Sequence, residues 1–184
     1  MNDPHRLNRR TNIIIHVNEE AERFYSKSQE LGSLAAESFQ GQNSGNKKRE
    51  HRAQMTGLEN IAETTMKVSD VLDYIKKQTA RQPGWSMVYD GRRLSGFLNH
   101  YQEYEGRRFG EILKNYIEND LDKIRERICS AIGIGNLSDD DQRDRQQVYL
   151  HLIRQLVRQL VVQYEYQVSE LERSREVEKD RERR

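Results

Sequence analysis

The chain has a single cysteine, two prolines and no long apolar run. Because Cys129 alone cannot form an intramolecular disulfide, the composition favours a reducing, cytoplasmic setting. The most apolar stretch, YLHLIRQLVRQLVVQYEYQ at 149–167, is interrupted by arginine and glutamine, whereas a membrane-spanning helix needs about 20 consecutive apolar residues. The opening MNDPHRLNRR has no apolar core of signal-peptide length. We therefore expect no contact with a membrane.

Catalytic and metal-binding signatures are also missing. The histidines show no HExxH pair or other metal-ligand spacing; they are His5, His16, His51, His100 and His151. Cys129 has no CxxC partner and is predicted to point away from its helix's apolar stripe, so we interpret it as an inert surface or interface cysteine. The acids at 139–141 are explained as first-turn residues of a helix. We expect a non-enzymatic protein with no cofactor, no metal and no small-molecule substrate.

Composition favours an all-α fold. Apolar residues make up 34% and charged residues 33% of the chain. That is too polar for a β-sandwich or a doubly wound α/β sheet, whose buried strands need runs of valine and isoleucine. Frequent glutamate, lysine, arginine and glutamine are typical of helices. We predict a bundle of four to six helices over 50–170, with a flexible N-terminal arm at 1–49 and a charged C-terminal tail at 171–184.

The arm and the tail are set apart by their composition. In the arm, one helix is expected to begin near Asn18, a plausible N-cap followed by acids. The segment QGQNSGNKKRE at 40–50 has the composition of a flexible linker. The tail mixes both signs of charge with a single valine, which is typical of either a solvated helical extension or a disordered segment.

Two long helices are predicted inside the bundle. The first carries one apolar stripe and is ended by Gly133 and Gly135; its stripe is Phe109, Ile112, Leu113, Tyr116, Ile117, Leu121, Ile124, Ile128 and Ile132. Ser138 is the expected cap of the second, which carries the 149–167 stretch. About half of that helix's circumference is apolar, formed by Tyr149, Leu150, Leu152, Ile153, Leu156, Val157, Leu160, Val161, Tyr164 and Val168. A face this wide indicates a central helix that packs against two or three others.

The side of the last helix opposite its apolar face is basic. Arg154 and Arg158 lie there one turn apart, with His151 beside them. This side could meet RNA, another subunit or only water. A second, weaker apolar strip, formed by Val148, Val162 and Tyr166, suggests a further contact with another copy of the chain.

Basic pairs recur in an internal echo, in which GRRLSGFLNHYQEY at 91–104 aligns with GRRFGEILKNYIEN at 106–119. Arginine suits phosphate because its planar fork donates two hydrogen bonds at once, and a neighbouring aromatic side chain could stack on an unpaired base. The predicted nucleic-acid contacts are Arg81, Trp85, Arg92, Arg93, Arg107, Arg108, Arg154 and Arg158. The competing interpretation is a solvated surface paired with acids, since the net charge is only +1.

Three segments together resemble the small subunits of CRISPR type III effector complexes: ETTMKVSDVLDYIKKQ, GRRFGEILKNYIEN and the closing VYLHLIRQLVRQLVVQYEYQ. The resemblance covers about two-thirds of the chain. It implies a non-catalytic subunit of an antiviral defence complex, present in copies stacked along the guide–target RNA duplex. Arginine and lysine would contact the RNA backbone. The chain departs from that pattern in its N-terminal arm, its charged tail and the GRR echo.

Two functions are therefore expected. The first is a non-enzymatic subunit of an RNA-guided assembly that contacts the phosphate backbone through arginines. The alternative is a homo-oligomeric helical scaffold or adaptor that binds other proteins and no nucleic acid. Near-neutral charge favours the alternative, and the clustered GRR pairs favour the first.

Overall fold

The computed structural model describes residues 4–40, 47–89 and 104–182. Its helices are α1 (Pro4–Arg23), α2 (Tyr25–Gln40), α3 (Lys47–Thr64), α4 (Val68–Arg81), α5 (Pro83–Ser86), α6 (Phe109–Asn115), the π-helical η2 (Tyr116–Leu121), α7 (Asp122–Ala131) and α8 (Asp139–Glu182). α6, η2 and α7 follow one another without a break. The described residues contain no strand, only an isolated bridge between Val88 and Arg108. The predicted all-α bundle is confirmed.

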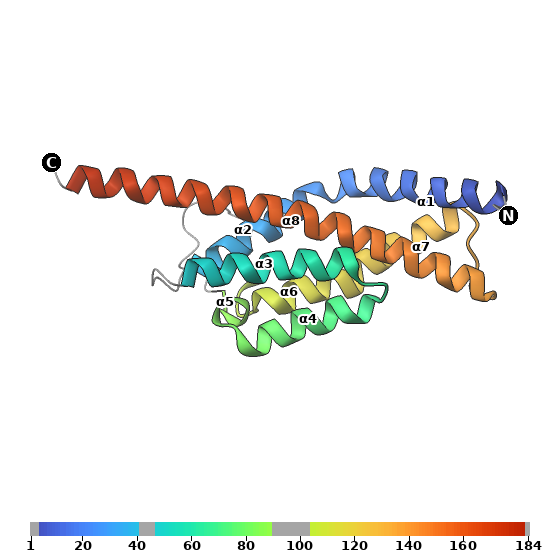
Figure 1. Ribbon diagram of the computed structural model, residues 1–184, viewed down its shortest axis with the longest axis horizontal. Helices are drawn as coiled ribbons and strands as arrows, with labels where there is room; N and C mark the ends of the chain where they lie inside the picture. Colours follow the sequence, from blue (N-terminus) through green and yellow to red (C-terminus); the bar gives the residue numbers. More distant parts are fainter. Residues whose placement is uncertain (1–3, 41–46, 90–103, 183–184) are drawn as a thin grey trace.

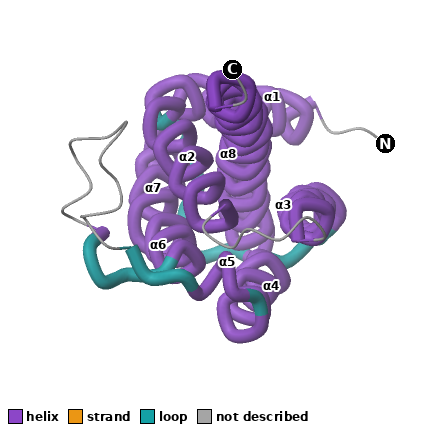
Figure 2. The backbone as a smooth tube through the Cα atoms, turned by 90° about the vertical axis from the view of Figure 1, so that its left-hand side faces the viewer, coloured by secondary structure: helices purple, strands orange, loops and turns teal. Residues whose placement is uncertain are grey.

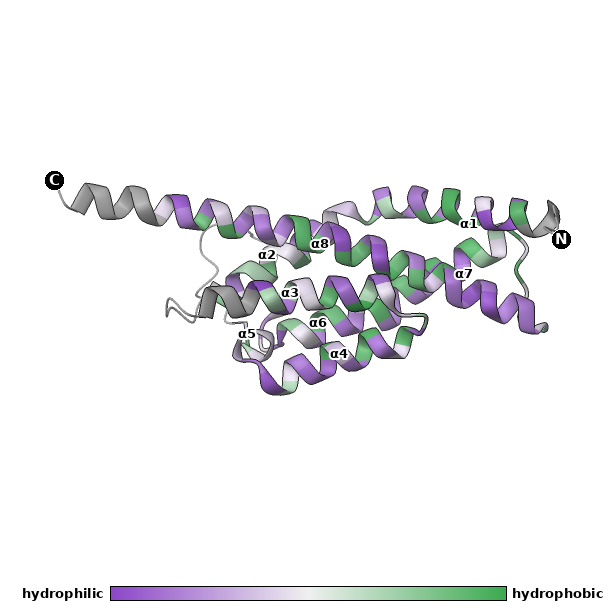
Figure 3. Cartoon of the chain, in the orientation of Figure 1, coloured by the Kyte–Doolittle hydropathy of each residue, from purple (hydrophilic) through white to green (hydrophobic). Residues whose placement is uncertain are grey.

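α8 is the central helix of the bundle. Its 44 residues span about 66 Å. It contacts α1, α2, α3 and α7, which lie around it in Figure 2. Every residue of its predicted apolar face is buried. The charged tail continues α8 as a helix to Glu182, and this end extends past the other helices (Figure 1). Figure 3 shows apolar residues gathered where α3, α4 and α6 meet.

Residues 4–40 belong to the bundle, whereas the sequence led us to expect a flexible arm. They form two helices, and Asn18, the expected cap, lies inside α1. The reason is an apolar stripe that the surrounding charges hide: Ile13, Val17 and Ala21 recur every four residues and are buried. α2 lies deeper still, and its fully buried residues include Leu31, Leu34, Ala35 and Ala36.

Polar contacts also attach α1 to α7 and α8. The Glu20 carboxylate is buried and pairs with Arg127 of α7 at 2.8 Å. Arg9 pairs with Asp141, and its Nε lies 2.9 Å from Asp144. The acids that begin α8 therefore have a cation of α1 as partner. These contacts give the N-terminal helix a fixed position along α8.

Two predicted helix ends are confirmed. The Asp141 N–H donates to Ser138 Oγ at 3.1 Å, which caps the start of α8. α7 ends at Ala131, and Gly133 has a φ of 71°, the left-handed conformation that glycine adopts after helices. Cys129 differs from its prediction: it is buried, because α1 packs against α7. Burial raises the pKa of its thiol, which favours the less reactive thiol form.

Two predicted segments lie largely outside the described residues. They are the linker at 40–50, of which 47–50 belong to α3, and the first GRR segment at 91–104. The second GRR segment is described and leads directly into α6.

Glu37 is a half-buried carboxyl group of α2, and its Oε2 has no hydrogen-bond partner among the residues that the structure describes. Burial raises the pKa of Glu37 from 4.5 to about 7. Between those pH values the folded chain keeps a proton that the unfolded chain has released. The protonated Glu37 carboxyl therefore makes its full contribution to the free energy of unfolding below pH 4.5, and this contribution is lost as the pH rises through about 7. The shift corresponds to at most about 3 kcal/mol, and solvent around the half-buried side chain reduces this, so Glu37→Gln should remove a fall of about 1–2 kcal/mol in the free energy of unfolding.

Urea unfolding of both proteins at about pH 5 and about pH 8 checks this expectation. The control is Glu22→Gln, an exposed position of α1, which should keep the wild-type pH dependence. Identical pH profiles for wild type and Glu37→Gln would contradict the assignment.

Candidate nucleic-acid interface

Arg154 does not face outward as predicted, because α3 covers that side of α8. Its guanidinium donates from Nε to the Ala62 carbonyl and from Nη2 to the Thr65 carbonyl, both at 3.0 Å. The last carbonyls of a helix lack partners within the helix, and a cation there is favourable. Arg154 therefore stabilises the end of α3 and is not available for the predicted backbone contact.

Arg158 is turned toward α3 in the same way. It pairs with Glu63 at 2.7 Å while its side chain stays 53% exposed, and exposed pairs of this kind contribute about 0–1 kcal/mol. His151 on the same side is half-buried, and burial followed by the charge of Arg154 lowers its pKa. The predicted row of cations is thus a contact between α3 and α8, not a track for a nucleic acid.

Trp85 does not lie where the sequence analysis expected an aromatic side chain able to stack on a base. It lies in α5 with 0% of its surface exposed. Its ring centroid is 5.2 Å from that of Phe109, 5.9 Å from Phe39 and 6.3 Å from Tyr74. A side chain enclosed by three rings has no face left for a base, so Trp85 belongs to the core.

Three predicted arginines do lie at one end of the bundle. The C-terminal half of α4 packs on the start of α6 so tightly that Thr79 and Gly110 are in contact, which brings Arg81 near Arg108. The chain around the GRR turn is held by the Val88–Arg108 bridge and by a hydrogen bond from the Tyr89 N–H to the Arg107 carbonyl at 3.0 Å. We call this surface the arginine end; it consists of Arg81, Arg107 and Arg108, all of which are exposed.

The arginine end carries few counter-charges. Within the described residues Arg81 and Arg107 have no ion pair, and the Arg108 guanidinium lies 3.8 Å from Glu111. Arg92 and Arg93 lie outside the described residues, so the structure does not place them. Of the predicted contacts, Arg81, Arg107 and Arg108 lie at the arginine end. Arg154 donates to carbonyls at the end of α3, Trp85 is buried in the core, and Arg158 pairs with Glu63.

One group of basic side chains was missed by the sequence analysis. Lys67, Arg125 and Arg145 come from three different parts of the chain and line one cavity. No spacing in the sequence joins them, because only the packing of α4, α7 and α8 brings them together. In the sequence, the only indication of this group was that each of the three residues is basic.

Among the described residues, no group of three or more histidine, cysteine, aspartate or glutamate side chains could hold a metal ion. No helix in that part of the chain has the length and apolar character needed to cross a membrane. Comparisons with protein-family models, curated proteins and solved structures found no match to this chain.

Proposed function

We propose that this protein is a non-enzymatic helical subunit that binds the phosphate backbone of RNA through the arginine end. The observation that carries the proposal is the convergence of Arg81, Arg107 and Arg108. They are exposed and come from two segments that the α4–α6 contact holds together. Guanidinium groups arranged this way can each donate two hydrogen bonds to a phosphate.

The proposed binding is independent of base sequence. Phosphate contacts position a protein on a nucleic acid, whereas sequence is read through base contacts. Trp85 is buried and offers no stacking face, so the arginine end supplies charge and hydrogen bonds only. Affinity should therefore be dominated by released counterions and fall steeply with salt.

Replacing the arginine end with Arg81→Gln, Arg107→Gln and Arg108→Gln in one protein should weaken binding of single-stranded RNA at least about tenfold in about 0.1 M salt. The slope of log K against log salt should become shallower by about 2, since each single-strand phosphate contact contributes about 0.7. Fluorescence anisotropy with a labelled oligonucleotide of mixed sequence measures both quantities.

The matched control removes the same charge elsewhere, with Lys123→Gln, Arg143→Gln and Arg173→Gln at exposed positions of α7 and α8. It should bind RNA nearly as wild type does. If both triple variants show the same affinity and the same salt dependence, the arginine end is not the RNA-binding surface.

The resemblance to small subunits of CRISPR type III effector complexes stays a prediction. It would give the arginine end the backbone of a guide–target duplex as its ligand. The three comparisons lend it no support, so the proposal depends on the arginine end alone.

A helical scaffold without nucleic acid is the second candidate, and it is favoured by exposed apolar side chains on α8, next to residues that contact α1. Gln155 and Gln159 contact α1 through Asn18 and the Ala21 carbonyl, at 3.2 and 3.3 Å. Val162 and Tyr166 continue the same stripe of α8 but are 66% and 58% exposed. Sedimentation of the proteins prepared for the RNA experiment distinguishes the two functions. Self-association that grows with concentration, together with no RNA binding, would favour the scaffold.

A further inference from the structure

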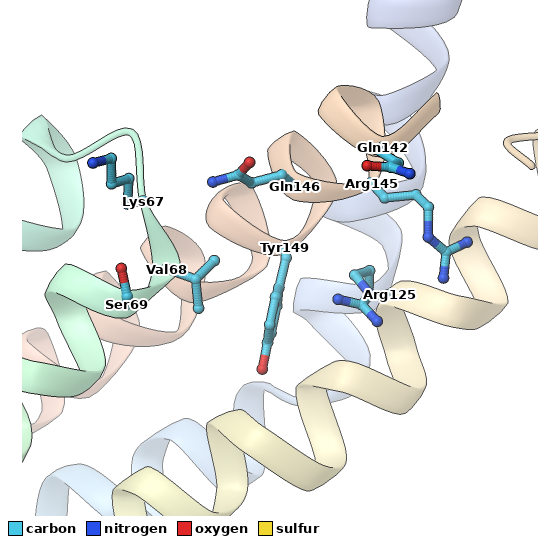
Figure 4. Close-up of a pocket in the computed structure, with 8 residues that line it drawn as sticks. All are labelled: Lys67, Val68, Ser69, Arg125, Gln142, Arg145, Gln146 and Tyr149. Carbon is cyan, nitrogen blue, oxygen red and sulfur yellow. The ribbon is translucent and has the colours of Figure 1, made fainter. Parts of the chain in front are cut away.

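A cavity of about 550 Å³ that is widely open to solvent lies at the surface between the start of α4, α7 and the first turns of α8. Figure 4 shows Arg125 and Arg145 on one side of it, Lys67 and Ser69 on the other, and Tyr149 between them. The volume is within the range of small-molecule sites, about 300–1,000 Å³. Its lining residues include three cations and no carboxylate. The cavity therefore offers hydrogen-bond donors and positive charge.

The two arginines are held in place and keep unused donors. Arg125 Nη2 donates to Glu126 Oε1 at 2.6 Å and lies 2.8 Å from Asp122, and the guanidinium stacks 5.0 Å from the ring centroid of Tyr149. Arg145 Nη2 donates to the same Glu126 oxygen. Neither acid lines the cavity. Two carboxylates thus orient the guanidinium groups from behind while the cations face the cavity.

Lys67 has no ion pair within the described residues, so its charge is uncompensated there. Counting Lys67, Arg125 and Arg145 against Asp122 and Glu126 leaves one net positive charge at the cavity. Lys67 also precedes the first turn of α4 without a side-chain cap for that helix. The amide groups of that turn add positive potential on the same side. The Tyr149 hydroxyl is already engaged, because it donates to the buried Ile117 carbonyl at 2.7 Å.

We propose that this cavity binds the terminal phosphate of a small phosphorylated molecule, with Arg125, Arg145 and Lys67 as its ligands. A terminal phosphate carries close to two negative charges and three acceptor oxygens at neutral pH, which matches two guanidinium groups on one side of the cavity and the exposed, flexible Lys67 side chain on the other. The cavity is larger than a phosphate group alone, so it has room for a nucleoside monophosphate. The same chemistry is offered by free phosphate and by the 5′-phosphate of an RNA.

This site is independent of the arginine end. Lys67 and Arg81 lie at opposite ends of α4, whose 14 residues separate them by about 20 Å. Loss of phosphate binding in a cavity variant therefore leaves RNA binding at the arginine end intact, and the reverse also holds. Failure of one proposal does not decide the other.

Isothermal titration calorimetry of the full chain with AMP, inorganic phosphate and adenosine tests the proposal. We expect binding of AMP and inorganic phosphate and none of adenosine. Lys67→Gln should weaken AMP binding severalfold without disturbing the fold, because the side chain is exposed. Arg145→Gln should weaken it at least about tenfold, since a guanidinium contributes a charge-assisted fork.

Glu126→Gln should change the affinity for AMP in the opposite direction. The hydrogen bond from Arg145 lowers the pKa of Glu126, so its carboxylate is charged; glutamine keeps an oxygen that accepts from both guanidinium groups and removes one negative charge near the ligand. The neutral variant should bind AMP severalfold more tightly, a result that general loss of structure cannot produce. Lys123→Gln on α7, outside the cavity, is the control and should bind as wild type does.

The ligand's source is decided by a second comparison. Tighter binding of AMP than of inorganic phosphate supports a small phosphorylated molecule. Tighter binding of a 5′-phosphorylated RNA than of AMP, lost with a 5′-hydroxyl, supports an RNA end. The proposal is overturned if neither phosphate nor AMP binds at up to about 10 mM, or if Lys67→Gln, Arg145→Gln and Glu126→Gln all bind AMP as wild type does.

Discussion

Trp85→Ala is expected to lower the free energy of unfolding by about 3–5 kcal/mol, the usual cost of emptying a large aromatic site in a core. Trp85 is fully buried and joins three parts of the chain through its contacts with Phe39 of α2, Tyr74 of α4 and Phe109 of α6. Its removal leaves a void that these rings cannot close without moving their helices. Urea unfolding followed by circular dichroism measures the loss.

Trp85→Phe is the matched variant. In the described part of the chain the buried indole N–H of Trp85 has no partner, so the phenyl ring keeps most of the packing and removes an unsatisfied donor. It should cost clearly less than alanine does. Trp85 is also the chain's single tryptophan, which makes its fluorescence a direct report. Emission typical of an exposed indole, quenched by iodide in the native state, would contradict burial and restore the stacking role.

The sequence predicted α8 well because the information needed is local. An apolar face repeats along one helix, and a helical wheel shows it without knowledge of any neighbour. The same is true of Ser138 and Gly133, whose capping roles depend on residues within one turn. At these positions the local signal was enough, whereas Asn18, also chosen on local grounds, lies inside α1 because an apolar stripe continues the helix on both sides of it.

The wheel could not show what covers each side of α8. Arg154 and Arg158 lie on the polar side, as predicted, and only tertiary packing places α3 there. An arginine that ends another helix looks the same in the sequence as one that meets a phosphate. The cavity cations Lys67, Arg125 and Arg145 were missed for the related reason that three helices contribute one each.

The helical character of α2 was expected, as part of the one helix predicted in the arm, but its burial was not, because most of its buried residues are small. Its centre, GSLAAES at 32–38, has one leucine as its only large apolar side chain. In the structure these small residues allow α2 to approach α8 closely. Burial then follows from backbone proximity and not from the size of the side chains.

Gly32→Ala tests that close approach. A Cβ atom at Gly32 would lie 2.6 Å from the Leu160 carbonyl oxygen and 2.7 Å from Gln163 Cβ. Neither atom can rotate away, since one belongs to the backbone of α8 and the other is fixed to it. The two helices must separate, and overpacking of this kind costs about 1–3 kcal/mol. Alanine favours the helix over glycine by about 1 kcal/mol, which offsets part of this cost, so we expect a net loss of about 1 kcal/mol.

Two comparisons make the result specific. Ser26→Ala, an exposed position of α2, should change stability by less than about 0.5 kcal/mol. Gly57→Ala on α3 meets the hydroxyl end of Tyr74, at 2.3 Å; this end can shift if its hydrogen bond to the Gln54 carbonyl is given up, so the cost should be smaller than that of Gly32→Ala, where backbone must move. If Gly32→Ala is instead as stable as wild type, helix propensity alone decides that position. α2 and α8 then lie further apart than the structure has them, and the small residues of α2 do not serve to bring the two helices together.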